Sequence, residues 1–159
     1  MLNKYFTLLW GVVSVLVIDF ITKMLVVRGV IGEFTFINNV FYLTAYQQND
    51  GIAFGIELAR WLQILGSIVI LMLLVHLCFD YVMRSRHSTV FGSFMLGAVL
   101  GGGLGNLIDR IIHGYVVDFI VLKPFPVFNV ADIGITLGLL VVFATIVLSS
   151  RSSGTETKN

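Results

Sequence analysis

The 159-residue chain has little charge for its length, since only 12% of its residues are Asp, Glu, Lys or Arg. Soluble domains carry about a quarter charged residues, so the composition excludes a water-soluble globular protein. The formal net charge of +1 gives no basic footprint for binding nucleic acid. A hydrophobic content of 57% and a mean hydropathy of +0.96 indicate an integral membrane protein instead.

Cysteine and several common catalytic motifs are also scarce or missing. The single cysteine, Cys78, lies in an apolar run, which excludes an internal disulfide and fits a small buried hydrophobe. The three histidines lack the spacing of metal ligands, so we expect no metal site. No serine lies in a G-x-S-x-G elbow, and the glycine run 101–105 lacks the lysine of a phosphate-binding loop.

Four apolar segments are long enough to cross ~30 Å of hydrocarbon as helices of about 20 residues. They lie at roughly 5–27, 60–81, 88–111 and 130–149. The third carries Gly97, Gly101 and Gly105 at four-residue spacing, which lets helices pack closely in lipid. We expect the first segment to be retained, because Asp19 and Lys23 interrupt it and no small-residue cleavage site follows.

Two stretches between these helices have the composition of β-structure. The residues between the first and second segments mix aromatic and β-branched side chains with a turn signal, "NDG". We expect them to form a short β-structure on the membrane face, with "IAFGIEL" (52–58) dipping into the interface. A second run, "YVVDFIVL" (115–122), ends at two prolines. Residues 1–150 form one domain, and the polar tail 151–159 is expected to be disordered.

The distribution of basic residues favours one orientation in the membrane. Lys23 and Arg110 are expected at membrane depth and are left out of the comparison. Five of the remaining basic residues then share one side and three the other. The positive-inside rule places both termini and the 82–88 loop in the cytoplasm.

Charged residues at membrane depth are candidates for function, because burying them is costly. Asp19 and Lys23 are spaced i, i+4 and can pair on one helix face. Structural support and direct substrate contact both stay open as roles for this pair. A polar stripe ends the third segment, formed by Asn106, Asp109, Arg110 and His113.

Residues of this stripe and two further aspartates have distinct expected environments. Asp109 has basic neighbours that favour a satisfied, ionised carboxylate, and Arg110 offers a planar fork of donors. Asp118 lies between apolar neighbours, so burial would raise its pKa, although a solvated loop position is the alternative. Asn129 and Asp132 have the spacing of an N-cap and its capping box, which favours an anionic Asp132. Two acids whose pKa values are pushed apart indicate an acid and a base.

Five blocks in order then carry a resemblance to a known family. The chain resembles the bacterial lipoprotein signal peptidases (signal peptidase II), the membrane aspartyl proteases of prolipoprotein processing. The blocks are "DFITK" (19–23), "NDGIAF" (49–54), "GNLIDR" (105–110), "VVDF" (116–119) and "FNVAD" (128–132).

The resemblance implies a mainly α membrane fold with four transmembrane helices. It adds a small extracytoplasmic β-cradle after helix one and a short interfacial amphipathic helix over the site. The implied catalytic pair is Asp118 and Asp132. Implied substrate-binding or supporting positions near the pair are Asn49, Gly51, Arg110, Asn129, Asn106, Asp109, Asp19 and Lys23.

By the same resemblance, the substrate is a diacylglyceryl-modified prolipoprotein, cut on the amino side of its lipid-modified cysteine. The implied partners are this substrate and membrane lipid, with no nucleic acid and no cofactor. Inhibitors such as globomycin are expected to bind the dyad, and the protein is expected to be a monomer. The implied location is the bacterial cytoplasmic (inner) membrane, with cytoplasmic termini and an active site near the outer face.

Two other classes of function stay open from the residues alone. A small transporter or ion-binding membrane protein would use intramembrane Asp, Lys and Arg as a relay. A non-enzymatic assembly subunit would use the glycine stripe as a docking face, and Asn substitutions at Asp118 and Asp132 would then leave its function intact.

Overall fold

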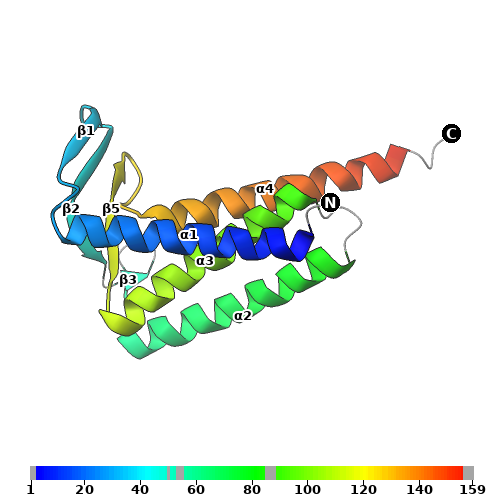
Figure 1. The fold of residues 1–159 in the computed structure, drawn as a ribbon, viewed down its shortest axis with the longest axis horizontal. Helices are drawn as coiled ribbons and strands as arrows, with labels where there is room; N and C mark the ends of the chain where they lie inside the picture. Colours follow the sequence, from blue (N-terminus) through cyan, green and yellow to red (C-terminus); the bar gives the residue numbers. More distant parts are fainter. Residues whose placement is uncertain (1–2, 50, 53–55, 85–88, 156–159) are drawn as a thin grey trace.

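The computed structural model has four long helices and a small sheet at one end of them (Figure 1). It describes residues 3–49, 51–52, 56–84 and 89–155. The predicted helices are confirmed, as α1 (Lys4–Val27), α2 (Arg60–Arg84), α3 (Val90–Ile112) and α4 (Val130–Thr155). The strands are β1 (Phe34–Ile37), β2 (Phe41–Asn49), β3 (Gly51–Ile52), β4 (Ile56–Glu57) and β5 (Val116–Leu122).

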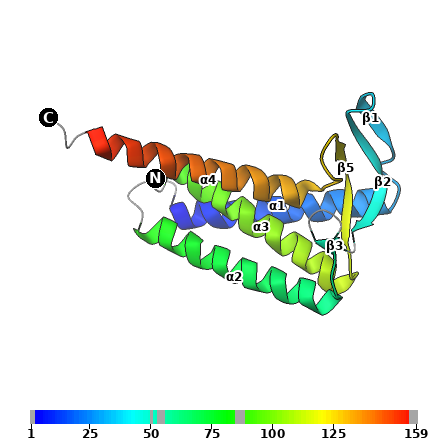
Figure 2. The same ribbon diagram turned by 180° about the vertical axis from the view of Figure 1, so that it is seen from behind.

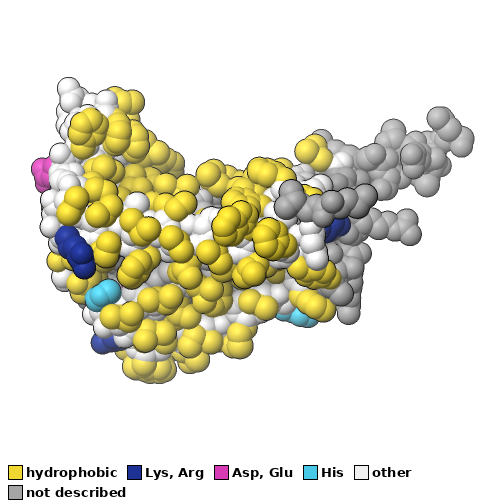
Figure 3. Space-filling model, viewed as in Figure 1, with side chains coloured by type: hydrophobic (Ala, Val, Ile, Leu, Met, Phe, Trp, Pro, Cys, Tyr) yellow, Lys and Arg dark blue, Asp and Glu magenta, His cyan; other side chains and the backbone are white. Residues whose placement is uncertain are grey.

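The outer surface of the helices is that of a membrane protein. Within the described residues, α1, α3 and the Arg60–Phe79 part of α2 are each long and apolar enough to cross a bilayer. The apolar part of α4, Val130–Thr145, is shorter. Hydrophobic side chains cover the middle of the visible face, and charged ones lie near its ends (Figure 3). Large apolar side chains such as Trp10 and Phe143 point outward, as lipid contact requires.

Glycines let α3 lie at the centre of the helices, in contact with α1, α2 and α4. A Cβ on Gly97 would overlap the Leu8 carbonyl of α1, and one on Gly101 would lie 2.5 Å from the Val12 carbonyl oxygen. On the other side of α3, a Cβ on Gly102 would overlap a backbone carbonyl of α4. The predicted close packing at these small residues is therefore confirmed.

The sheet caps the end of the helices at which α1 and α3 end and α4 begins (Figures 1 and 2). Its strand order is β1-β2-β5, and both pairs are antiparallel. The register of β2 and β5 sets Gln47 opposite Asp118 and Asn49 opposite Val116. The predicted β-like run is confirmed as β5, which is buried from Val116 to Val121.

The predicted β-structure after α1 is confirmed, but the expected interfacial helix is not found among the described residues. Instead, β3 and β4 pair with each other, Gly51 opposite Glu57 and Ile52 opposite Ile56. Such a short stretch cannot sustain a helix alone, and its β-branched residues favour extended backbone. Residues 53–55 of the expected segment lie outside the described part.

At the other end of the chain, α4 runs through Thr155. The helix therefore enters the segment 151–159 that the sequence predicts to be disordered. Residues 156–159 lie outside the part that the structure describes.

The glycine contacts lead to a stability prediction. Gly97→Ala should destabilise the protein by about 1–3 kcal/mol, because its methyl group must displace the α1 backbone. Gly66→Ala is the matched control, since nothing lies within 4 Å of a Cβ there. That control should be neutral or up to about 1 kcal/mol more stable from helix propensity. Thermal unfolding in detergent micelles measures both, and equal melting temperatures would contradict the packing.

Candidate active site

Asp118 is buried in the middle of β5, with only 2% of its surface exposed. Its Oδ2 accepts a hydrogen bond from Asn49 Nδ2 at 2.8 Å, and its Oδ1 accepts one from Asn129 Nδ2 at 2.7 Å. Burial raises the pKa of Asp118 to about 6, against the opposing effect of these amide donors. The solvated loop position is therefore excluded, and the predicted rise in pKa is confirmed in direction.

Asp132 lies in the first turn of α4 and forms the predicted capping box with Asn129. The Asp132 N–H donates to Asn129 Oδ1 at 3.0 Å, and the Asn129 N–H donates to Asp132 Oδ2 at 3.3 Å. Asp132 Oδ1 accepts a further hydrogen bond from Asn106 Nδ2 at 2.8 Å. The positive end of the helix dipole also favours a negative charge here.

Asn129 joins the two aspartates. It is fully buried, and its side chain contacts Asp118 through Nδ2 and Asp132 through Oδ1. The charge of Asp132 is one of the causes that raise the pKa of Asp118. The structure therefore brings these two acids, 14 positions apart in the chain, into one electrostatic unit.

Three asparagines direct their amide NH2 groups toward the two carboxylates, and each carbonyl oxygen is fixed by a different donor. Asn49 Oδ1 accepts from the Gly51 N–H at 3.1 Å. Asn129 Oδ1 accepts from the Asp132 N–H, and Asn106 Oδ1 accepts from Lys23 Nζ at 3.0 Å. All of these residues are among the predicted supporting positions, and the structure brings them together around the pair.

Lys23 lies at the centre of a buried charge cluster behind Asn106. Its ammonium lies 2.7 Å from Asp19 Oδ2 and 2.8 Å from Asp109 Oδ2, so the predicted Asp19–Lys23 pair is confirmed. Only 1% of Asp19 and 5% of Lys23 is exposed. With Asn106 as third acceptor, the three N–H groups of the ammonium have three partners. The ammonium therefore has no N–H group left to offer a substrate.

Asp19 has a second contact that the sequence does not reveal. Its Oδ1 accepts the Ala131 N–H at 2.9 Å, so a carboxylate of α1 caps the start of α4. A Cβ on Gly105 would lie 2.7 Å from Asp19 Oδ2, so the glycine leaves room for the carboxylate. The "GNLIDR" block carries that glycine, but nothing local in the sequence connects it to Asp19.

Asp109 and Arg110 have different surroundings at the end of α3. Asp109 Oδ2 also accepts the Val117 N–H at 3.3 Å, as expected for a satisfied carboxylate. His113 Nδ1 lies 3.9 Å from the other oxygen, and 48% of the histidine side chain is exposed. Arg110 interacts electrostatically with Asp132, Asp118 and Asp109, and its Nε finds no partner within the described residues. The guanidinium is therefore a positively charged, planar group of donors beside the acids.

Arg60, at the start of α2, also supports the site, which the sequence does not predict. Its Nε donates to the Arg110 carbonyl at 3.2 Å and its Nη2 to the Ile111 carbonyl at 2.8 Å. These contacts satisfy carbonyls in the last turn of α3 and fix the turn that carries Arg110.

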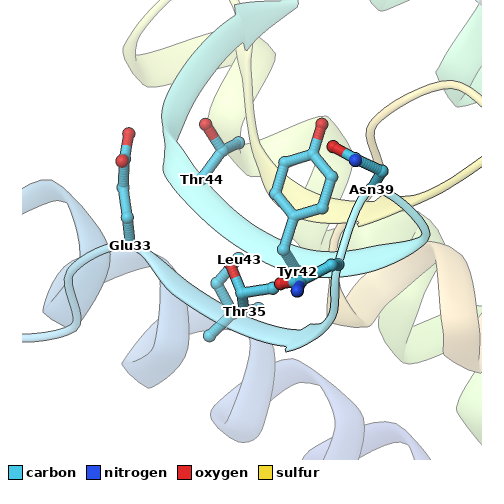
Figure 4. Close-up of a pocket in the computed structure, with 7 residues that line it drawn as sticks. Glu33, Thr35, Asn39, Tyr42, Leu43 and Thr44 are labelled. Atoms are coloured by element: carbon cyan, nitrogen blue, oxygen red, sulfur yellow. The ribbon is translucent and has the colours of Figure 1, made fainter.

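A separate pocket of about 490 Å³ lies on the β1–β2 hairpin, away from the two acids (Figure 4). It is lined mainly by polar side chains of this hairpin. Within the described ranges, no group of three or more His, Cys, Asp or Glu residues is arranged to hold a metal ion.

Comparisons with known proteins identify the family of the chain. The family model described as "Signal peptidase (SPase) II" matches residues 11–148. The chain belongs to the signal peptidase II family. It is similar to the lipoprotein signal peptidase of Geobacillus kaustophilus, with 38% identity over 84% of this chain and 88% of that protein. The corresponding protein of Halalkalibacterium halodurans is also 38% identical, over 89% of this chain and 92% of that protein.

A solved structure supports the membership of the signal peptidase II family at the level of the fold. It is a bacterial membrane enzyme determined by the in meso method at 2.3 Å resolution. The two chains are 28% identical, with a TM-score of 0.75 over 96% of this chain and 92% of that one.

The raised pKa of Asp118 leads to a prediction for this signal peptidase II. The folded state holds the proton up to about pH 6, whereas the ordinary pKa is 3.8. The free energy of unfolding should therefore fall as pH rises from about 4 to 6. Asp118→Asn has no carboxyl group to titrate and does not lose this stability. The free energy of unfolding of the variant, relative to that of wild type, should therefore increase by up to about 3 kcal/mol between pH 4 and 6.

Thermal unfolding of both proteins between pH 4 and 7 measures this difference. Glu33→Gln, a change at an exposed carboxylate, is the control and should show no such gain. A constant difference between Asp118→Asn and wild type at all pH values would contradict the raised pKa.

Proposed function

We propose that Asp118 and Asp132 are the catalytic pair with which this lipoprotein signal peptidase, a membrane aspartic endopeptidase, cleaves its substrates. The observation that carries the proposal is the pair of acids joined by the buried Asn129 side chain. One acid is desolvated on a strand, and the other lies at a helix N-terminus. Burial raises the pKa of Asp118, as a general acid requires, and a helix N-terminus is a favourable place for a negatively charged base.

The pair works by sharing one proton, because two close carboxylates do not both ionise readily. Ionised Asp132 takes a proton from a water molecule, whose oxygen attacks the scissile carbonyl carbon. Protonated Asp118 donates its proton to the carbonyl oxygen, which gives a neutral tetrahedral intermediate. When the C–N bond breaks, the leaving nitrogen takes the proton held by Asp132, and Asp118 recovers its own from the diol. The pair returns to its starting state without a metal or an organic cofactor.

The residues around the pair have matching tasks. Asn49 and Asn129 hold the Asp118 carboxyl in place, and the Gly51 N–H fixes the Asn49 amide. Arg110 binds a substrate carbonyl beside the scissile bond, since its planar guanidinium lies within electrostatic reach of both acids.

The substrate is a diacylglyceryl-modified prolipoprotein, cut on the amino side of the lipid-modified cysteine. The apolar helix surfaces beside the site give its acyl chains and signal helix an environment like lipid. The peptide bond reaches the acids where the helices meet the sheet. The enzyme acts as a monomer, and inhibitors of the globomycin type bind at the dyad.

The β1–β2 hairpin has one aromatic and one polar face, which supports a location of the site at the outer membrane face. Phe34 and Phe36 are 58% and 53% exposed, and Phe36 stacks on Phe41 with ring centroids 4.6 Å apart. Polar residues such as Thr35 and Tyr42 occupy the opposite face, so the hairpin suits the boundary of lipid and water. In this arrangement α4 is the fourth span of the bacterial inner membrane, and α1 begins and α4 ends on the cytoplasmic side.

The test of this proposal is cleavage of a diacylglyceryl-modified prolipoprotein in detergent or vesicles. Asp118→Asn and Asp132→Asn should each lower the cleavage rate by about 10²- to 10⁴-fold, because each removes the acid or the base. Gel mobility of the released mature lipoprotein measures the rate.

Glu33→Gln is the matched control, as it makes the same acid-to-amide change outside the site, and it should cleave normally. An unmodified precursor tests the dependence on the lipid. Retained cleavage in either folded dyad variant would contradict the assignment and favour a transport or assembly role.

Arg110→Lys gives a prediction for substrate binding. Lysine keeps the charge but lacks the planar fork, so KM should rise about tenfold, the equivalent of one charged hydrogen bond, with a smaller change in kcat. Steady-state kinetics with the modified precursor measure both constants. An unchanged KM would exclude a contact between Arg110 and the substrate.

A further inference from the structure

The orientation of the Asn106 amide follows from its three hydrogen-bond partners. Its Oδ1 accepts from Lys23 Nζ at 3.0 Å and from Asn129 Nδ2 at 3.2 Å, while its Nδ2 donates to Asp132 Oδ1 at 2.8 Å. A flipped amide would set NH2 against an ammonium and another NH2. It would also set a carbonyl oxygen against the Asp132 carboxylate. Only one orientation satisfies every group, and it supplies Asp132 with a donor.

Lys23 is the charged group that enforces this orientation. An ammonium has donors only, so it can never accept a hydrogen bond from an amide NH2. Its other two contacts, to Asp19 and Asp109, hold the ammonium in place from two different helices. Asn129 adds a second donor, but its own amide is also bonded to the Asp118 carboxylate and to the Asp132 backbone N–H.

We propose that Lys23 is a positioning residue that acts through Asn106 to keep Asp132 in the ionised state that a general base requires. The inference rests on the proposed function, because it assigns the base role to Asp132. Lys23 itself touches neither substrate nor water in this scheme. All three of its N–H groups already have partners in α1 and α3.

The other charges around Asp132 do not replace this effect. Asp118 of β5 faces it as a second acid and opposes its ionisation. Arg110 of α3 favours its ionisation but is reserved for the substrate. Behind Asn106, the positive charge of Lys23 is exceeded by the two negative charges of Asp19 and Asp109. The cluster therefore acts on Asp132 through a directed hydrogen bond rather than through excess positive charge.

The test uses a double variant that preserves the net charge of the cluster, Lys23→Met with Asp109→Asn. Loss of the fixed amide donor should destabilise the ionised base, so the acidic limb of the pH–rate profile should move to higher pH. We expect kcat at neutral pH to fall on the order of 10- to 100-fold, as for a lost hydrogen bond to a charged group. KM should stay unchanged, because Lys23 does not contact the substrate.

Two further variants separate positioning from general support. Thr22→Val is the matched control on the same helix, since the threonine hydroxyl bonds only carbonyls of α1, those of Ile18 and Asp19. It should show the wild-type profile. Asn106→Ala should shift the acidic limb in the same direction as the double variant. Combining it with the double variant should add no further shift, because both remove the same interaction.

Three results would overturn the proposal. One is a loss of rate with a wild-type acidic limb in the folded double variant. Another is an acidic limb that shifts further when Asn106→Ala is combined with the double variant than in either alone. If the double variant does not fold, Asn106→Ala alone decides, and a wild-type acidic limb there overturns the proposal. Failure of the proposed function looks different, because wild type would then not cleave the modified precursor or folded Asp118→Asn and Asp132→Asn would still do so.

Discussion

The buried ammonium of Lys23 is the interaction on which the rest of the site depends. Two carboxylates and an amide oxygen surround it, so removing one partner would leave uncompensated charge in an apolar interior. Asp19 extends the cluster to α4 through the Ala131 N–H. One polar cluster therefore fixes α1, α3 and the start of α4 relative to one another, close to Asp118 and Asp132.

That cluster can form only because the helix backbones approach closely. Gly97 and Gly101 let α1 contact α3 along one side, and Gly102 admits the backbone of α4 on the other. Gly105 leaves the space that the Asp19 carboxylate occupies. Apolar helix surfaces gain nothing from the hydrophobic effect when they associate in lipid, so small residues and buried polar contacts must hold the helices together. In this chain the glycines allow the helix backbones to approach closely, and the buried charges fix how the helices are aligned.

Local spacing in the sequence predicts part of this architecture. The helices, the extended run that forms β5, the Asp19–Lys23 pair and the Asn129–Asp132 capping box all follow from patterns within a few residues. The long-range contacts do not. Asp19 reaches Ala131 across 112 positions, and Asn49 reaches Asp118 because β2 pairs with β5 in one register. Where the sequence predicts an interfacial helix, the described residues Gly51–Ile52 and Ile56–Glu57 pair as strands instead, as β-branched side chains favour. The assignment of the catalytic pair comes from the family resemblance together with this geometry.

The unequal exposure of the two acids explains why the site lies at the junction of helices and sheet. The proposed general base must meet water, and Asp132, in the first turn of α4, is only half-buried. The proposed general acid needs a raised pKa, and burial within β5 raises that of Asp118 to about 6. Deep in the bilayer neither acid would meet water, and on the surface neither would be desolvated. The helix N-terminus provides the first environment and the covered strand the second. The Asn129 side chain lies between the two acids, with one hydrogen bond to the Asp118 carboxylate and one to the Asp132 backbone N–H.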